Sequence, residues 1–220
     1  MLKKTKMLTA VVAIAGLVLA LAPAAQAALI TGVTASAKDN EGVRTATKAV
    51  DGSGMTGVTV AGTGMHDVTG DNMWLGQSST NAGPQWINVD LGGLYTVGDM
   101  YMWNYKEGGG GDGGRQVVTY NLWYSADASA TPGTFTDPKW TQLPGGTINA
   151  TQVGAGSSYG FSDQIAINQD ARVIGFEILT GVDNRAGIAE LQFDGALVPE
   201  PSTMGLLALS GLALLRRRRA

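Results

Sequence analysis

Only a few residue types in this chain could perform covalent or acid–base chemistry. The sequence has no cysteine and a single histidine, His66, so a thiolate metal site and a cysteine nucleophile are both impossible. A Ser-His-Asp triad would have to use His66, which lies in a glycine-rich stretch without a nucleophile-elbow sequence. The 18 acidic residues offer carboxylate pairs, but surface and cation-binding roles account for them. We predict that the protein is not an enzyme.

The charge distribution favours cations over nucleic acid as partners. Seven of the 15 basic residues lie near the two ends of the chain, at Lys3, Lys4, Lys6 and residues 216–219. Residues 7–215 therefore hold eight basic and all 18 acidic residues, a net charge of 8 − 18 = −10. So acidic a segment repels phosphate backbones, whereas it suits divalent cations. We predict no binding to nucleic acid.

Residues 1–27 have the three parts of a secretory signal peptide. A cationic start at Lys3, Lys4 and Lys6 precedes an apolar run over residues 7–21, and Ala25-Gln26-Ala27 forms a small-x-small cleavage site. We expect export with cleavage after Ala27; the alternative is an uncleaved membrane anchor. The exported domain would then span residues 28–197.

The central segment has the pattern of an all-β domain. Ile87, Val89 and Leu91 alternate with polar residues, which indicates a half-buried strand, and Gly92-Gly93 is expected to end it in a sharp turn. Two glycine-rich stretches, residues 52–72 and 107–115, are expected to be loops. A two-sheet sandwich is the predicted packing. Strand-like runs recur at residues 32–36, 86–91, 97–104, 116–125, 160–167, 172–180 and 188–193.

The C-terminal segment, residues 198–220, has three parts in a fixed order. Pro199-Glu200-Pro201 comes first, followed by an apolar run over residues 204–215 and the arginines at 216–219. As a helix the run would span only about 18 Å of the roughly 30 Å hydrocarbon core. The order resembles the PEP-CTERM sorting signal of Gram-negative bacteria. The resemblance implies a short hydrophobic helix, processing by an exosortase-type enzyme, a transient stage at the inner membrane as a transmembrane segment, and a cell-surface or extracellular destination.

Three segments of the body together resemble the discoidin or coagulation factor five/eight C-type domain, which has the galactose-binding-like fold. They are residues 48–52 with the later Trp74, residues 85–93, and residues 187–195. The resemblance implies a jelly-roll β-sandwich of about eight strands with its chain ends close together. It also implies that Asp51 and Glu190 can reach one cation, as hard oxygen ligands of the kind that calcium prefers.

By position, the resemblance implies a structural calcium ion. The sixth contributor is open between Thr56, which keeps the usual distance from Asp51, and Asn72, which keeps the usual distance from Trp74. The alternative is that Asp51 only caps a turn and that Glu190 is a surface residue of its strand. The other implied ligands are the carbonyls of Lys48, Ser53 and Ala189 and the side chains of Asp51 and Glu190.

Domains of this kind bind ligands at loops on one end of the sandwich, and sugar sites usually combine an aromatic face with hydrogen-bonding groups. Several candidates have alternative roles: Trp103 in the core, Arg115 paired with Asp112 or Glu107, and His66 solvated in its loop. The loop over residues 181–187 has no aromatic residue. The candidate ligand residues are His66, Trp103, Asn104, Arg115, Asn184 and Arg185.

Two hypotheses for the function follow. The first is a calcium-stabilised carbohydrate-binding domain that attaches to extracellular polysaccharide or another glycan. The second is a structural surface or matrix protein that acts through protein contacts without binding sugar. The loop arginines and asparagine favour the first, and the missing loop aromatic favours the second.

Overall fold

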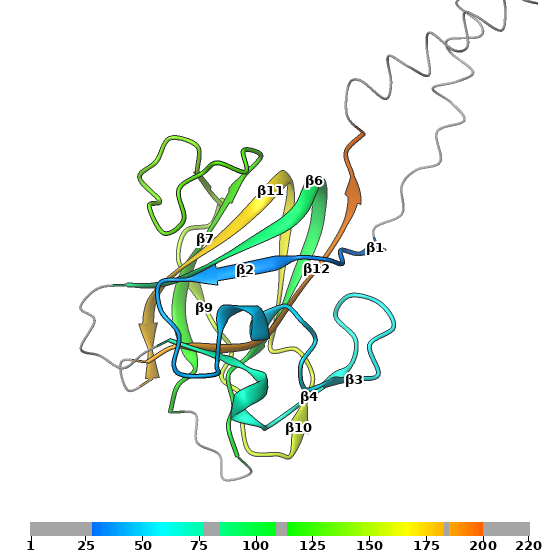
Figure 1. Ribbon diagram of the computed structural model, residues 1–220, viewed down its shortest axis with the longest axis vertical. Coiled ribbons are helices and arrows are strands. Elements are labelled where there is room, and N and C mark those ends of the chain that lie inside the picture. Colours follow the sequence, from blue (N-terminus) through cyan, green and yellow to red (C-terminus); the bar gives the residue numbers. More distant parts are fainter. Residues whose placement is uncertain (1–27, 77–83, 109–113, 183–184, 200–220) are drawn as a thin grey trace, which may run out of the picture.

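The computed structural model describes residues 28–76, 84–108, 114–182 and 185–199, and its elements are nearly all strands (Figure 1). The predicted β-sandwich is confirmed. Two short 3₁₀ helices, η1 (Ala46–Ala49) and η2 (Gly70–Asn72), lie between strands. The strands are β1 (Ala28–Leu29), β2 (Thr34–Ala37), β3 (Met55–Thr56), β4 (Met65–Asp67), β5 (Trp74–Leu75), β6 (Gln85–Asn104), β7 (Val117–Ser125), β8 (Thr141–Gln142), β9 (Ile148–Asn149), β10 (Ser158–Tyr159), β11 (Asp163–Gly181) and β12 (Gly187–Leu197).

Two strands of 20 and 19 residues, β6 and β11, form the frame of the domain. They pair antiparallel along nearly their whole length, from Ile178↔Gln85 to Asp163↔Met102. The first half of β6 lies between β2 and β11, and its second half lies between β12 and β11. Each long strand therefore takes part in both layers of the sandwich, as Figure 1 shows.

The expectation that Gly92-Gly93 ends a strand is wrong. Gly92 has the positive φ of 80° that was expected of a turn residue, but the chain bends there and continues as one strand to Asn104. The register with β11 shifts at this bend, between the pairs Asp90↔Val173 and Tyr95↔Ala171. A bulge thus replaces the predicted turn, because a positive φ serves a kink within a strand as well as an exit from it.

A similar irregularity joins the two runs that were predicted near residues 160–167 and 172–180. They form the single strand β11, with Asn168 at a φ of 49° and a register shift between Ala166 and Gln169. The stretch over residues 52–72 is also more regular than expected. There β3 and β4 form a hairpin that pairs with β10 in a small second sheet.

The core lies between the two layers. Ile87, Val89 and Leu91 are fully buried, as their alternation predicts, and they share a cluster with Phe176 of β11 and Phe193 of β12. Burial of such aliphatic and aromatic side chains is the main stabilising contribution. A smaller cluster holds Met73, Leu75, Trp103, Tyr105, Tyr159 and Ala189.

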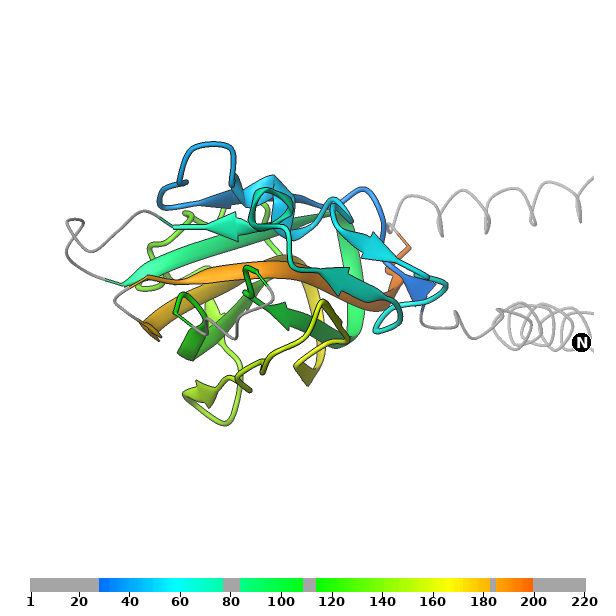
Figure 2. The same ribbon diagram turned by 90° about the horizontal axis from the view of Figure 1, so that it is seen from below.

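The two ends of the described domain lie side by side. Ala28 pairs with Gly195 and Leu29 with Asp194, so β1 lies along the end of β12 (Figure 2). Across the described ranges no helix is long and apolar enough to cross a membrane. The predicted signal peptide and the hydrophobic part of the tail lie outside these ranges.

Gly187 opens β12 at a point where the backbone is closely covered. A Cβ at this position would lie 2.7 Å from the carbonyl oxygen of Trp74 and would also clash with the ring of Tyr105. We expect Gly187→Ala to lower the free energy of unfolding by about 1–3 kcal/mol, because a backbone atom cannot move aside. Urea unfolding measures this change.

Gly160→Ala is the matched control, since nothing lies within 4 Å of its Cβ position. It should leave the unfolding free energy unchanged within about 0.5 kcal/mol or raise it slightly. Equal stabilities for the two variants would contradict the close packing of β5 and Tyr105 on Gly187.

Candidate cation and ligand sites

Asp51 and Glu190 come together where the turn after η1 meets β12. The Gly52 N–H donates to Glu190 Oε2 at 3.3 Å, although 138 residues separate the two. Glu190 is 3% exposed, while Asp51 accepts a hydrogen bond from the Ser53 N–H at 2.8 Å. The turn over residues 51–53 therefore sets one carboxylate at the surface beside a second one that is buried.

Burial raises the pKa of Glu190 to about 8; the Gly52 N–H opposes this shift, and the nearby charge of Asp51 adds to it. Lys48 forms an ion pair with Asp51: its Nζ lies 3.7 Å from Asp51 Oδ2 and 3.1 Å from Ser53 Oγ. Two carboxyl groups thus lie near each other, and the Lys48 ammonium pairs with one of them, Asp51. This arrangement would gain from a further cation between them.

The remaining predicted calcium ligands divide into two groups. Lys48, Ser53 and Ala189 lie on the same two segments as the carboxylates, at the end of η1, in the turn and in β12. By contrast, the Thr56 hydroxyl donates to the Met65 carbonyl, and the Asn72 amide donates to Asp67. Neither side chain hydrogen-bonds to the two carboxylates. Among the described residues no group of three or more His, Cys, Asp or Glu could hold a metal, so carbonyls would have to complete any site.

Three predicted ligand residues are buried and cannot form an open surface. Trp103 is fully buried in the smaller cluster, which agrees with its alternative role in the core. His66 is also fully buried, with Nδ1 2.7 Å from the Asp67 carbonyl oxygen and its ring 5.9 Å from that of Tyr159. The expectation of a solvated loop histidine is therefore wrong, because the hairpin of β3 and β4 encloses it.

Asn104 is the third buried residue among the predicted ligand residues, and its side chain hydrogen-bonds only to the protein backbone. Its amide nitrogen donates to the carbonyls of Val117 and Thr151, and its Oδ1 accepts from the N–H groups of Tyr105 and Val117. All four hydrogen-bonding positions of the side chain are used. Asn104 therefore links the end of β6 to β7, and its amide has no group left for a sugar.

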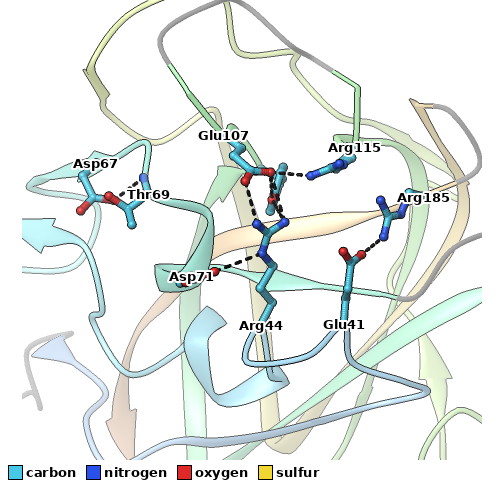
Figure 3. Close-up of polar contacts among 9 residues, drawn as sticks. Glu41, Arg44, Asp67, Thr69, Asp71, Glu107, Arg115 and Arg185 are labelled. Carbon is cyan, nitrogen blue, oxygen red and sulfur yellow. Dashed lines mark hydrogen bonds and ion pairs between the residues drawn. The ribbon is translucent and has the colours of Figure 1, made fainter.

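Arg115 and Arg185 lie in a polar cluster at the loop end of the sandwich (Figure 3). We call Glu41, Arg44, Asp71, Tyr105, Glu107, Arg115 and Arg185 the arginine cluster. Arg44 is its centre: Nη2 donates to Glu107 Oε1 at 2.6 Å, Nη1 donates to Glu107 Oε2 at 3.1 Å, and Nη1 also donates to the Tyr105 hydroxyl at 2.9 Å. The Arg44 Nε lies 3.5 Å from Asp71.

The other two arginines complete this cluster. Arg115 pairs with Glu107, which is one of its two predicted partners. Arg185 pairs with Glu41. Asp112 and Asn184 lie outside the described residues. The hydrogen bonds from Arg44 and Tyr105 hold the pKa of Glu107 below its usual value, although burial opposes this shift. Burial and the bond to Glu107 raise the pKa of Tyr105 to about 12.

Sequence reasoning missed Glu41 and Arg44. They form an isolated bridge with each other across a turn that carries Gly42 at a φ of 59° and Val43 at its tip, 64% exposed. The only sequence signal was a short Glu-Gly-Val-Arg turn, which does not indicate that Arg44 reaches Glu107, 63 residues away.

Comparison with known proteins bears on the tail and the fold separately. Residues 197–219 match the PEP-CTERM protein-sorting motif. A comparison with curated proteins finds no match. Among solved structures, CBM32-3 from a family 31 glycoside hydrolase of Clostridium perfringens is 20% identical with a TM-score of 0.53, over 76% of this chain and 94% of that one. The F5/8 type C domain of a Bacteroides fragilis protein is 16% identical with a TM-score of 0.52, over 80% and 100%.

A family 89 glycoside hydrolase from Clostridium perfringens is 23% identical with a TM-score of 0.50; the match covers 78% of this chain but only 15% of the hydrolase. At these identities the likeness shows the fold. The chain thus combines a discoidin-like, galactose-binding-like β-sandwich with a C-terminal sorting motif that implies export. The predicted PEP-CTERM sorting signal is confirmed by the motif match, and the predicted discoidin-like fold is confirmed by the likeness to these structures.

Glu190 should make calcium-free stability depend on pH. In the unfolded chain a glutamate releases its proton near pH 4.3, whereas folded Glu190 keeps its proton up to about pH 8. The stabilising effect of the protonated form is therefore complete below pH 4.3 and is lost as pH rises through 8. We expect the unfolding free energy to fall across this window by up to about 1.4 kcal/mol per pH unit.

Glu190→Gln should remove this fall, and urea unfolding in chelator between pH 5 and 8 measures it. Asp170→Asn, which changes an exposed acid, controls for the general loss of one negative charge. Parallel profiles for the wild type and Glu190→Gln would contradict the pKa of about 8.

Proposed function

We propose that the protein is an exported carbohydrate-binding protein whose loop end holds the sugar. The observation that carries this proposal is the arginine cluster, in which half-exposed Arg115 and Glu107 lie beside each other at one end of the sandwich. A guanidinium donates to hydroxyls and a carboxylate accepts from them, so the pair can hold two neighbouring hydroxyls of one ring. The fold shared with CBM32-3 is compatible with this role.

The remaining residues of the cluster would either position Glu107 or add contacts to the sugar. Arg44, whose side chain is only 16% exposed, holds Glu107 with a two-pronged contact and fixes the direction of its carboxylate. Arg185 and Glu41 provide a second donor and acceptor pair nearby. Exposed Val43 offers the apolar contact for ring C–H groups that a loop aromatic would otherwise supply.

A calcium ion between Asp51 and Glu190 is the second part of the proposal. The side chains of both residues would hold it, with the carbonyls of Lys48, Ser53 and Ala189, and either Thr56 or Asn72 would supply the last contact. The buried, nearly unpartnered carboxylate of Glu190 supports this choice. A bound calcium ion supplies charge neutralisation there and joins the turn after η1 to β12.

The proposed route of export and sorting follows from the segments at residues 1–27 and 198–220. The signal peptide over residues 1–27 would direct export, and an exosortase-type enzyme would recognise Pro199-Glu200-Pro201 during a transient stage at the inner membrane of a Gram-negative bacterium. The domain over residues 28–197 would then reach the cell surface or extracellular polysaccharide. The sorting motif at residues 197–219 supports this route.

A structural role without sugar binding is the second candidate function. It is favoured by the pairing of every charged group of the arginine cluster with another protein group, and by the burial of Trp103 away from any ligand. In this case the cluster would only brace the loops, and the surface would bind other proteins.

Calcium should raise the melting temperature of the purified protein. A ligand at 100 times its dissociation constant adds about 2.7 kcal/mol to the unfolding free energy. The shift should be larger at pH 8 than at pH 6, because calcium needs ionised Glu190 and must displace its proton. Calorimetry with calcium or with chelator measures both effects.

Asp51→Asn and Glu190→Gln should each abolish the calcium shift, whereas Asp170→Asn should retain it. Lys48→Met keeps the main-chain carbonyl and removes the competing ammonium, so its shift should equal or exceed that of the wild type. A full shift in Glu190→Gln would show that calcium binds elsewhere.

Sugar binding at the arginine cluster should be visible on a glycan and polysaccharide array. Arg115→Ala should lower the signal at least about tenfold, because the sugar loses the Arg115 guanidinium as a hydrogen-bond donor and Glu107 loses one of its ion-pair partners. Lys139→Ala removes a surface ion pair with Asp127 and should leave the signal unchanged. An array that stays silent for the folded wild type would reject the carbohydrate proposal and favour the structural one.

A further inference from the structure

The loop that joins β3 to β4 holds apolar side chains in water. We call residues 57–64 the hairpin tip; they consist of glycine, valine, threonine and alanine and include no charged residue, although the body of the chain is strongly acidic. Val58 is 37% exposed and Val60 is 58% exposed. Met65, which follows the tip as the first residue of β4, is 42% exposed.

Hydrogen bonds hold the hairpin tip in one shape. The Thr63 hydroxyl oxygen accepts from the Val60 N–H at 3.1 Å and donates to the Val60 carbonyl oxygen at 2.6 Å. The Gly62 N–H donates to Gln192 Oε1 of β12 at 3.1 Å. A Cβ on Gly62 would clash with the ring of Tyr101, so the tip is packed closely onto the sheet. The two valines are therefore exposed on a loop whose backbone the rest of the domain fixes.

The hairpin tip lies at the same end of the domain as the two chain ends. Val58 lines one pocket together with Leu29 of β1 and Val33. The end of β12 lies beside β1, since Gly195 pairs with Ala28. Figures 1 and 2 show the hairpin of β3 and β4 on the side of the domain where β1 and the end of β12 lie. We call the hairpin tip, β1 and the end of β12 the chain-end face.

The C-terminal segment limits the distance between this face and a membrane. Leu197 ends β12 with 59% of its surface exposed, and the Val198 N–H still donates to the Leu94 carbonyl oxygen at 2.9 Å. The apolar run begins at residue 204, which is 204 − 198 = 6 residues further on. Six extended residues span at most about 20 Å. A bilayer that holds the apolar run therefore lies close to the chain-end face, whereas β12 carries the loop end roughly 33 Å away from it.

The chemistry of the hairpin tip suits a bilayer interface better than the opposite end of the domain does. Valine side chains gain about 25 cal/mol for each Å² of apolar surface that leaves water, and the tip has no charge to desolvate. At the loop end, the guanidinium and carboxylate groups of the arginine cluster favour water. Exposed Asp51 borders the same pocket as Val58, which limits the contact to the tip and keeps it shallow.

We propose that the chain-end face contacts the membrane while the protein is anchored, with Val58 and Val60 in the interface of a bilayer. The proposal rests on the membrane stage of the proposed route. Two valines bind a bilayer weakly, but the anchored segment keeps them at a high effective concentration beside it. The contact would select one orientation of the domain, in which the arginine cluster points away from the bilayer toward material outside.

The lack of cysteine in the chain permits a fluorophore at one chosen residue. The environment-sensitive dye NBD is attached to Val60→Cys in one full chain and to Val43→Cys in another, since both positions are exposed turn residues, at 58% and 64%. Each chain is reconstituted into phosphatidylcholine vesicles and recovered by flotation. Residues 7–21, where they are retained, leave from the same face, because β1 begins at Ala28.

The dye at residue 60 should emit at shorter wavelength in vesicles, and the dye at residue 43 should not. Apolar groups at an interface lie roughly 5–10 Å into it, so brominated lipid should quench the dye at residue 60 at least about twofold more strongly than the dye at residue 43.

Val58→Asp, made in the chain that carries the dye at residue 60, should abolish both signals while the chain still floats. Leu179→Asp is the matched control, because Leu179 is 38% exposed against 37% for Val58 and lies near the loop-end terminus of β11. It should leave the emission and the quenching at residue 60 unchanged.

The outcomes separate this proposal from the proposed function. Flotation with the dye at residue 60 in water, or equal quenching at residues 60 and 43, would overturn the proposal and preserve the route of export. A blue shift that needs no vesicles and grows with protein concentration would instead assign the hairpin tip to contact between two copies. Failure to float would overturn both the proposal and the membrane stage, whereas the glycan array tests the sugar site independently of all these results.

Discussion

The structure depends on the antiparallel pairing of β6 with β11. Both strands cross from one layer to the other, and their pairing continues through bulges near Gly92 and Asn168. Because side chains alternate along a strand, this one pairing decides which residues enter the core and which face outward. It presents Trp86, Asn88 and Asp90 on the sheet face, and it brings the end of β6 to the loop end, where Tyr105 and Glu107 follow.

The hydrogen bonding of a buried polar side chain indicates whether the residue is structural or belongs to a candidate site. Asn104 has partners for all its hydrogen-bonding groups, so its burial stabilises the junction of β6 and β7. Glu190, by contrast, accepts one long hydrogen bond, from the Gly52 N–H, and has a raised pKa. A buried group whose hydrogen-bonding positions are all satisfied gains nothing further, whereas the Glu190 carboxylate would gain from a cation.

The sequence predicted what depends on local order and failed where distant segments meet. Alternation in residues 87–91 identified the core face, and the linear order of the tail identified the sorting motif. The glycines at 92–93 were misread because a positive φ fits a bulge and a turn equally. Burial of His66 depends on a hairpin with β10, and the role of Arg44 depends on Glu107. Local patterns carry none of this information.

The character of the proposed sugar site bears on how the protein would act. In the arginine cluster each charged group is already paired, so a sugar must replace existing hydrogen bonds and gains only the difference. This site alone is therefore expected to bind weakly. Sorting of several copies to one surface, which the motif at residues 197–219 implies, would offset this weakness, because a polymer that is held by one copy presents its next ring to a neighbouring copy at a high effective concentration.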